Sequence, residues 1–252
     1  MNPVVDRLLV FFALAQLVAC ASLHPVPEAG DPARTPWATA SSHTTQTPQW
    51  QHFTLPGKKS TQFTYTRTDG RDALSVIAIS SASMLRQVVR VEPQELDAVR
   101  FSWKVPALIK DADMALRDAD DSPVRIVLAF EGDRSNFSTK NSMLSELSRA
   151  ITGEEMPYAT LMYVWCNIRE PGSVIINPRT DRIRKMVVQS GPKQLNQWLD
   201  YTRNIRKDYE RAFGESPGAL VGIGIMTDND NTQTTTKAWY GPVRLTSHIA
   251  AN

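Results

Sequence analysis

Carboxylates are concentrated in one short stretch of the chain, directly before a segment that has the pattern of a β-strand. Five aspartates lie between residues 111 and 121, and Arg125 follows within the next five residues. Carboxylates at this density can bind a hard cation, share protons or cap turns. Arg125 alternates with apolar residues, so its guanidinium needs a planar acceptor, which Asp120 or Asp121 could supply. The pattern predicts either a structural ion pair that holds a loop or a contact with a ligand.

A second candidate region is the apolar segment 220–228, which ends in an aspartate. Strand alternation places Val221, Ile223 and Ile225 on one face, and the other face carries Gly222, Gly224, Met226 and Asp228. The two glycines leave room for close approach by a ligand or by an aromatic ring from a neighbouring strand.

The residues after this segment partly match a calcium-binding loop. Asp228, Asp230 and Thr232 have the spacing of its first ligands, but Gln233 and Trp239 occupy the positions that require glycine and glutamate. A helix-loop-helix calcium site is therefore excluded. A looser cation site and a turn stabilised by Asp and Asn side chains stay open as alternatives.

Aromatic residues on strands form the third candidate group. Tyr240 lies in the run Trp239-Tyr240-Gly241, and Trp103 and Trp165 lie on other predicted strands. Exposed rings on a sheet can stack on the C–H faces of sugars while nearby carboxylates and amides bind hydroxyl groups. Burial in the core is the alternative, and we expect it for Trp103.

Composition narrows the classes of function. The 252 residues include 28 Lys and Arg against 26 Asp and Glu, and this balance gives a formal charge of +2 without the positive field of a nucleic-acid-binding protein. The two cysteines, Cys20 and Cys166, are too few for a disulfide framework or a four-thiolate zinc site. The four histidines show no metal spacing, and no serine elbow is present. We therefore expect no metal and no cofactor, and we identify no known catalytic set.

The elements that must position these residues are mainly strands. Short segments rich in β-branched and aromatic residues recur between turn signals, which is typical of an antiparallel β-sandwich with about eleven strands. The predicted strands are 50–55, 62–67, 74–79, 84–91, 99–105, 124–131, 160–167, 174–176, 183–189, 220–227 and 238–246.

Two segments have helical periodicity instead. Ser142 to Ile151 predicts a short helix that ends at Gly153. Between Pro192 and Gly214, apolar residues recur three or four apart, which predicts an amphipathic helix of about six turns, capped near Ser190 and packed on the sandwich.

The beginning of the chain resembles a lipoprotein signal peptide. After Arg7, about a dozen mainly apolar residues lead to Ala19, fewer than the roughly 20 that a membrane-spanning helix needs. The sequence Leu17-Val18-Ala19-Cys20 resembles the bacterial lipobox, in which the cysteine receives a diacylglycerol. We therefore predict a signal peptide over 1–19 and lipid attachment at Cys20. Cleavage without lipid and an uncleaved anchor are the alternatives.

The predicted anchor implies a location and a domain division. No aspartate follows the cysteine, which resembles sorting to the outer membrane of Gram-negative cells, with the protein on its periplasmic face. Residues 20–49 are rich in Pro, Ser and Thr and predict a disordered tether, followed by a folded domain over 50–248. With Cys20 lipidated, Cys166 is expected to be a buried thiol.

Several motifs in this order resemble the bacterial domain-of-unknown-function family 3047. The motifs are Ser81-Ala82-Ser83, 120–125, 157–165, Asp208-Tyr209 with 212–214, and 226–232, and the similarity spans about Trp50 to Leu245. Family members of this kind are lipoprotein-like, and the family name implies no established activity. The last strands are more loosely similar to those of jelly-roll carbohydrate-binding modules.

The sequence as a whole favours an envelope lipoprotein that binds a glycan or another envelope component without catalysis. The alternatives are a glycan hydrolase or lyase with Asp121 and Asp228 as acid and base in one cleft, and a structural lipoprotein without a ligand site. We expect a membrane partner through the lipid and no nucleic-acid partner; the oligomeric state stays open. The predicted ligand-binding residues are Asp120, Asp121, Arg125, Trp165, Asp228, Asp230 and Tyr240.

Overall fold

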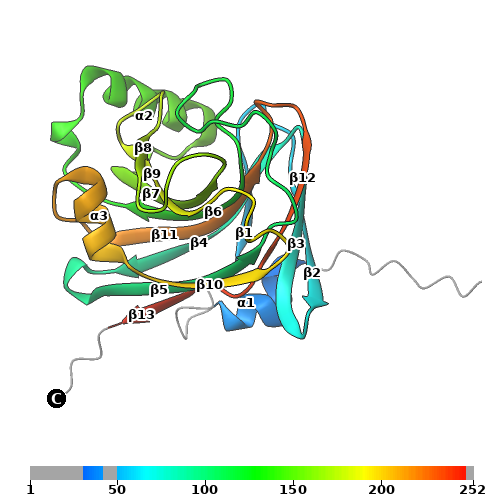
Figure 1. The fold of residues 1–252 in the computed structure, drawn as a ribbon. Helices are drawn as coiled ribbons and strands as arrows, with labels where there is room; N and C mark the ends of the chain where they lie inside the picture. Colours follow the sequence, from blue (N-terminus) through cyan, green and yellow to red (C-terminus); the bar gives the residue numbers. More distant parts are fainter. Residues whose placement is uncertain (1–30, 42–49, 248–252) are drawn as a thin grey trace, which may run out of the picture.

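Two packed β-sheets make up most of the computed structural model, which describes residues 31–41 and 50–247 (Figure 1). The strands are β1 Gln51–Thr54, β2 Gln62–Thr68, β3 Arg71–Ile79, β4 Ala82–Val91, β5 Leu96–Lys104, β6 Ser122–Phe130, β7 Ala159–Cys166, β8 Val174–Ile176, β9 Ile183–Ser190, β10 Trp198–Asn204, β11 Leu220–Asp228, β12 Thr235–Tyr240 and β13 Arg244–Ser247. The helices are α1 Pro36–Ala40, α2 Thr139–Thr152 and α3 Ile205–Phe213, with 3-10 turns at Pro32–Arg34, Pro93–Glu95 and Arg134–Asn136. None of these helices is long and apolar enough to cross a membrane.

The larger sheet has seven strands in the order β1-β4-β11-β6-β7-β9-β8. The second sheet has the order β10-β5-β12-β3-β2, and β13 also pairs with β5. This arrangement confirms the predicted mainly β, jelly-roll-like sandwich. The expectation of purely antiparallel pairing is wrong at one place, because β7 and β9 run parallel. Parallel neighbours need a crossover of a dozen or more residues, and residues 167–182 supply it.

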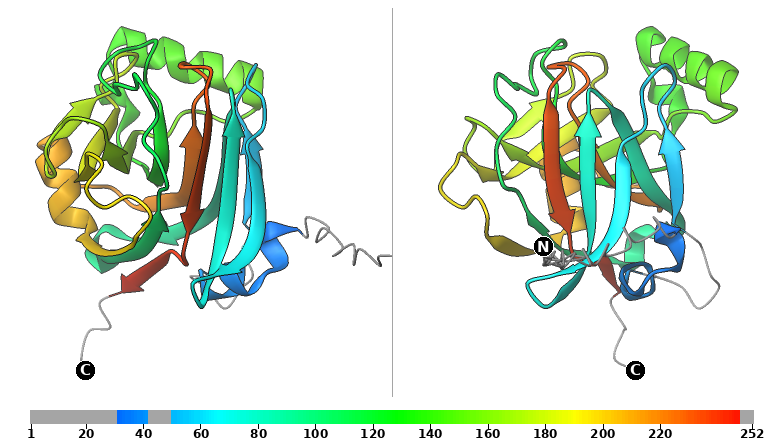
Figure 2. Two further views of the ribbon diagram at one scale, coloured as in Figure 1. Left: turned by 45° about the vertical axis from the view of Figure 1, so that its right-hand side comes forward. Right: turned by 90° about the vertical axis from the view of Figure 1, so that its right-hand side faces the viewer.

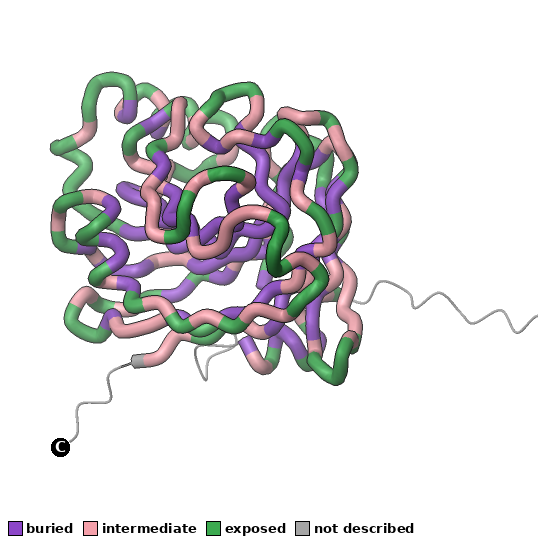
Figure 3. Tube along the Cα trace, in the orientation of Figure 1, coloured by how far each residue is buried: buried purple, intermediate pink, exposed green. Residues whose placement is uncertain are grey.

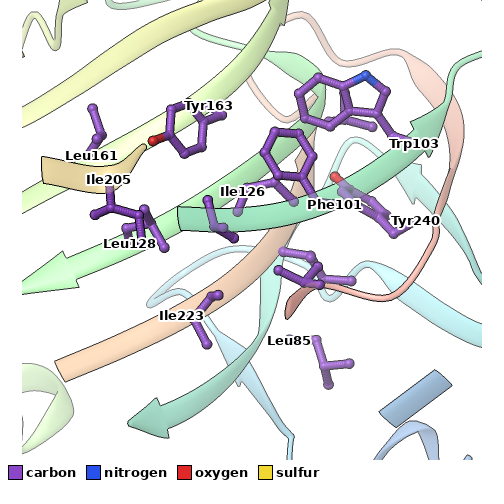
Figure 4. Packing of buried hydrophobic residues seen from close by; sticks show 14 of the residues in the cluster. Leu85, Phe101, Trp103, Ile126, Leu128, Leu161, Tyr163, Ile205, Ile223 and Tyr240 are labelled. Carbon is purple, nitrogen blue, oxygen red and sulfur yellow. The ribbon is translucent and has the colours of Figure 1, made fainter. Parts of the chain in front are cut away.

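Strand alternation separates two apolar regions. The main core lies between the sheets, where Phe101 and Trp103 of β5 lie near Tyr163 of β7 and Ile126 of β6 (Figure 4). The opposite face of the seven-stranded sheet carries a smaller apolar cluster that includes Val127, Met162 and Met226. Met114, from the long connection between β5 and β6, covers part of this second cluster. Buried residues are concentrated in the strands, and exposed residues lie mostly in the connections (Figure 3).

Helix α2 occupies the predicted short-helix segment, and its ends follow from local chemistry. The Ser138 side chain accepts a hydrogen bond from the Asn141 backbone N–H, and Gly153 ends the helix with a φ of 78°.

The predicted long helix from Pro192 to Gly214 is wrong over its first half. Residues 198–204 form β10, which pairs with β5, and α3 contains only nine residues. The apolar residues of this stretch fit a period of two as well as a period near 3.6. Leu199 and Tyr201 therefore pack on the core from an edge strand while Asp200 and Thr202 are exposed. The cap lies at Asn204 rather than near Ser190, and the helix ends at Gly214 as predicted.

Part of the predicted tether is folded. Thr35 caps α1, and Trp37 of this helix is completely buried, with its ring 4.9 Å from that of Trp50. The low apolar content of this segment suggested disorder, but one large aromatic side chain inserted into the sandwich is enough to order a short helix. Other positions of the predicted tether, and Cys20, lie outside the described residues. Helix α1 and helix α2 lie at opposite ends of the sandwich (Figure 2).

If Trp37 belongs to the core, its removal will destabilise the whole domain. We expect Trp37→Ala to lower the free energy of unfolding by about 3–5 kcal/mol, measured by chemical denaturation. Trp239→Ala is the matched control, because Trp239 is only half-buried and should lower stability much less. Equal effects of the two substitutions would show that α1 is not part of the cooperative fold.

Candidate functional site

A cleft of about 340 Å³ opens on the face of the seven-stranded sheet that points away from the inter-sheet core. Its floor is built by side chains of β1, β4, β6, β7, β9 and β11, and α2 with the residues that follow it supplies one wall. The volume is at the lower end of the range of roughly 300–1,000 Å³ that is usual for ligand sites. The cleft therefore has the size of a site for a small molecule or for a short part of a polymer.

Four residues that the sequence singled out meet in this cleft. Asp120, Arg125, Asp228 and Asp230 all line it. The sheet register explains the meeting of two of them: Met226 of β11 is the partner of Arg125 on β6, so Asp228, two residues further on, projects from the same face. The predicted alternation of both strands is therefore confirmed.

The Arg125 guanidinium holds two carboxylates at once. Its Nε donates to Oδ1 of Asp228 at 2.8 Å, and its Nη2 donates to Oδ2 of Asp228 at 2.9 Å. The same Nη2 also lies 3.0 Å from the backbone oxygen and 3.1 Å from Oδ1 of Asp120. Arg125 is 2% exposed, so this planar, bidentate contact lies almost completely out of water.

Lys185 completes the cluster and was missed by the sequence analysis. Its Nζ donates to Oδ2 of Asp120 at 2.5 Å and to the backbone oxygen of Met114 at 2.9 Å. The available signal was the position of Lys185 between Ile183 and Val187, which lie on the same face of a predicted strand. Asp120, Arg125, Lys185 and Asp228, here called the buried charge cluster, join β6, β9, β11 and the connection before β6.

Burial and charge act against each other in this cluster. Burial raises the pKa of Asp228 to about 6 despite the nearby Arg125, and burial lowers the pKa of Lys185 to about 8. Burial opposes ionisation of Arg125 as well, but Asp228 and Asp120 outweigh it and raise the pKa of this guanidinium. At Asp120 the two neighbouring cations outweigh burial and lower the pKa. The two acids and two bases are therefore predominantly charged at neutral pH.

Asp121 has a different role from the one predicted. It does not line the cleft; its Oδ1 accepts a hydrogen bond from Nδ2 of Asn231 at 2.9 Å, and its Oδ2 accepts one from the Thr232 N–H at 2.6 Å. The expectation that it contacts a ligand is wrong, because both of its oxygens brace the turn between β11 and β12. Asp230 lines the cleft and forms an ion pair with Lys58.

Three carboxylates come close enough to consider the looser cation site. Among the described residues, Asp121, Asp228 and Asp230 each bring one oxygen within 4.8 Å of the others. The protein's own donors already hold each of them: Arg125 and Lys58 bind Asp228 and Asp230, and backbone and amide N–H groups bind Asp121. The cluster is satisfied without an ion.

The two predicted aromatic ligand contacts are also wrong. Trp165 and Tyr240 are 0% exposed. Nε1 of Trp165 donates to the backbone oxygen of Gly191, and the Tyr240 hydroxyl donates to the backbone oxygen of Met226 at 2.5 Å. Both side chains project between the sheets because alternation turns them inward, so they stabilise the sandwich and cannot stack on a ligand. Cys166 is buried, as expected.

The fold and the cleft define a jelly-roll-like β-sandwich protein with a ligand-sized cavity on its larger sheet. The profile of the family described as "Protein of unknown function (DUF3047)" matches residues 48–244. The chain belongs to this family, as the sequence motifs suggested.

Solved structures with some similarity include an endoglucanase, a xyloglucanase domain and a xylan-binding module. Endoglucanase 3 of Trichoderma harzianum, from family GH12, is 9% identical, with 77% of this chain and 88% of that chain covered and a TM-score of 0.40. The xyloglucanase domain of NopAA from Sinorhizobium fredii, in complex with cellobiose, is 10% identical. The match covers 82% of this chain and 100% of that chain, with a TM-score of 0.36. The xylan-binding module CBM86 of Roseburia intestinalis is 14% identical. The match covers 77% of this chain and 94% of that chain, with a TM-score of 0.25. No curated protein matches the chain. The function of the chain must therefore be argued from its own cleft.

If the buried charge cluster holds the sheet and the loop together, removal of its central cation will be costly. Arg125→Met leaves Asp228 without its bidentate partner, and we expect a loss of about 3–5 kcal/mol in the free energy of unfolding. Arg71→Met is the control, since the Arg71–Asp200 pair is exposed and should contribute about 0–1 kcal/mol. Denaturant titration of both variants measures the difference, and a small effect at Arg125 would contradict the account.

Proposed function

We propose that this protein is a non-catalytic glycan-binding module of the cell envelope. The observation that carries the proposal is the combination, in one open cleft, of an apolar floor with polar groups around it. A sugar ring presents apolar C–H faces and polar hydroxyl edges, so it needs both kinds of surface within one site.

The lining of the cleft matches this requirement. Five apolar side chains from four strands, Ala82, Met84, Val127, Met162 and Met226, lie on the floor. The polar groups around them include the side-chain amides of Asn177 and Asn231, whose nitrogens donate to Asp120 and Asp121 and whose oxygens can accept hydrogen bonds from hydroxyls. Methionine is an adaptable apolar surface, and it takes the place of the exposed aromatic rings predicted from the sequence, Trp165 and Tyr240.

The position of the cleft agrees with an envelope role. The cleft is bordered by α2, at the end of the sandwich opposite α1 (Figure 2). Cys20 lies only eleven positions before Asp31, the first described residue, so an extended chain between them spans less than about 40 Å. A lipid on Cys20 would therefore keep the α1 end within about 40 Å of the outer membrane.

The geometry does not favour the alternative of a hydrolase or lyase that uses Asp121 and Asp228. That mechanism requires both carboxyl groups in one cleft, with access to the scissile bond. Asp121 lies outside the cleft lining, and Asp228 is held by the Arg125 guanidinium. A non-catalytic module is therefore the better account of these two residues.

The cleft can be filled without removing any charged residue. Met84 is half-buried in the floor, so Met84→Trp places a bulky indole in the cleft, whereas Met84→Ala leaves the cleft open. We expect the full chain and Met84→Ala to co-sediment with purified peptidoglycan sacculi or to bind on a glycan array, and Met84→Trp to lose at least about nine-tenths of that binding. Thermal melts establish that both variants fold.

Two results would overturn the proposal. Unchanged glycan binding by folded Met84→Trp would place the site elsewhere. Failure of the full chain to bind any glycan in either assay would favour a ligand of another class or a purely structural lipoprotein.

The proposed anchor has its own test. Cells that express the chain should incorporate labelled palmitate into it, and Cys20→Ala should abolish the label because the thiol is the attachment point. Cys166→Ala is the matched control and should keep the label, since that thiol is buried in the sandwich. Label retained in Cys20→Ala would exclude lipid at this position.

A further inference from the structure

The charged groups around the cleft are not balanced. Within the cleft, Arg125 and Lys185 neutralise Asp120 and Asp228, and Lys58 neutralises Asp230. These three cations and three acids leave no net charge. The balance is therefore decided by the remaining charged residues of the rim.

The acids of the α2 wall have cations of their own. Glu154 accepts two hydrogen bonds of 2.6 Å from the Arg86 guanidinium. Glu155 lies 3.0 Å from Arg134 and 3.5 Å from Arg149. Neither carboxylate is left to attract a cation from a ligand.

Arg179 is the exception. It lines the cleft and is exposed, and among the described residues no carboxylate lies within ion-pair distance of it. Its backbone N–H donates to the Asn177 side chain at 2.8 Å, and its side chain makes one long hydrogen bond within the described part of the chain, 3.5 Å from Nη2 to the backbone oxygen of Arg117. All other charged residues of the cleft lining are paired, so Arg179 gives the rim an uncompensated positive charge.

We propose that the ligand of this cleft carries an acidic group, a carboxylate or a phosphate, that pairs with Arg179. A guanidinium presents a planar set of N–H donors that fits either group in a bidentate manner. The sugar ring lies on the apolar floor while its acidic substituent reaches the rim at Arg179. This inference rests on the proposed glycan-binding function and names the class of glycan: acidic rather than neutral.

Three oligosaccharide probes of equal length separate the possibilities. They are a neutral gluco-oligosaccharide, the corresponding oligoglucuronate and the corresponding 6-phosphorylated oligosaccharide, each titrated calorimetrically into the full chain. We expect at least one acidic probe to bind about tenfold or more tightly than the neutral probe. This advantage should weaken as salt is raised, because the charge at the rim is exposed. The better of the two acidic probes identifies the source of the negative charge.

Variants locate the effect. Arg179→Gln should remove the advantage of the acidic probe over the neutral probe, and Arg179→Lys should restore part of it. Arg67→Gln is the matched control, because Arg67 is exposed on β2 of the other sheet and its loss should change nothing.

The possible failures are distinguishable. Equal affinity for neutral and acidic probes, with binding abolished by Met84→Trp, would overturn the acidic-ligand inference and keep the glycan site. An acidic advantage that survives in Arg179→Gln would overturn the assignment to Arg179. If none of the three probes binds, both this inference and the proposed function fail for these sugars.

Discussion

The structure depends on the burial of four charges in one place. Transfer of a single ion from water into a protein interior costs several kcal/mol. A buried arginine is therefore tolerated only where carboxylates surround it, as Asp228 and Asp120 surround Arg125. Lys185 supplies the second positive charge that two carboxylates require. These side chains come from three strands and a loop. Because the buried charges must pair with one another, they also fix how the three strands and the loop pack. The cleft lies next to this cluster.

This constraint separates the roles of the charged residues. The members of the buried charge cluster satisfy one another and have little capacity for a ligand, so they act mainly as a rigid base for the cleft. Groups available for the proposed recognition lie around it: the amide oxygens of Asn177 and Asn231, the methionine floor and Arg179. The two interpretations of Arg125 that the sequence left open, structural bracing and a place beside a ligand, are therefore compatible. Arg125 braces the strands from inside the cleft lining.

Much of the fold follows from the sequence, and the failures have physical causes. Alternation along β6 and β11 places Arg125 and Asp228 on the outer faces of their strands, but the adjacency of these two strands depends on long-range pairing that no local pattern contains. Lys185 was missed because a lysine on a strand is usually exposed. Its burial is favourable only because Asp120, from a distant segment of the chain, accepts a hydrogen bond from its ammonium group. The apolar residues of 198–204 fit both a helical and a strand period, and pairing with the edge of β5 stabilises the strand. Trp37 shows the reverse case, in which one buried ring orders a segment of disorder-like composition.

Amide hydrogen exchange of the full chain, with and without a bound acidic oligosaccharide, tests the central claim most directly. The cleft account predicts slower exchange in the segments that surround it, residues 55–60, 153–157, 176–180 and 229–232, with no change in the exposed turns of the six-stranded sheet. Slower exchange confined to the six-stranded sheet, or unchanged exchange around the cleft at saturating ligand, would contradict it.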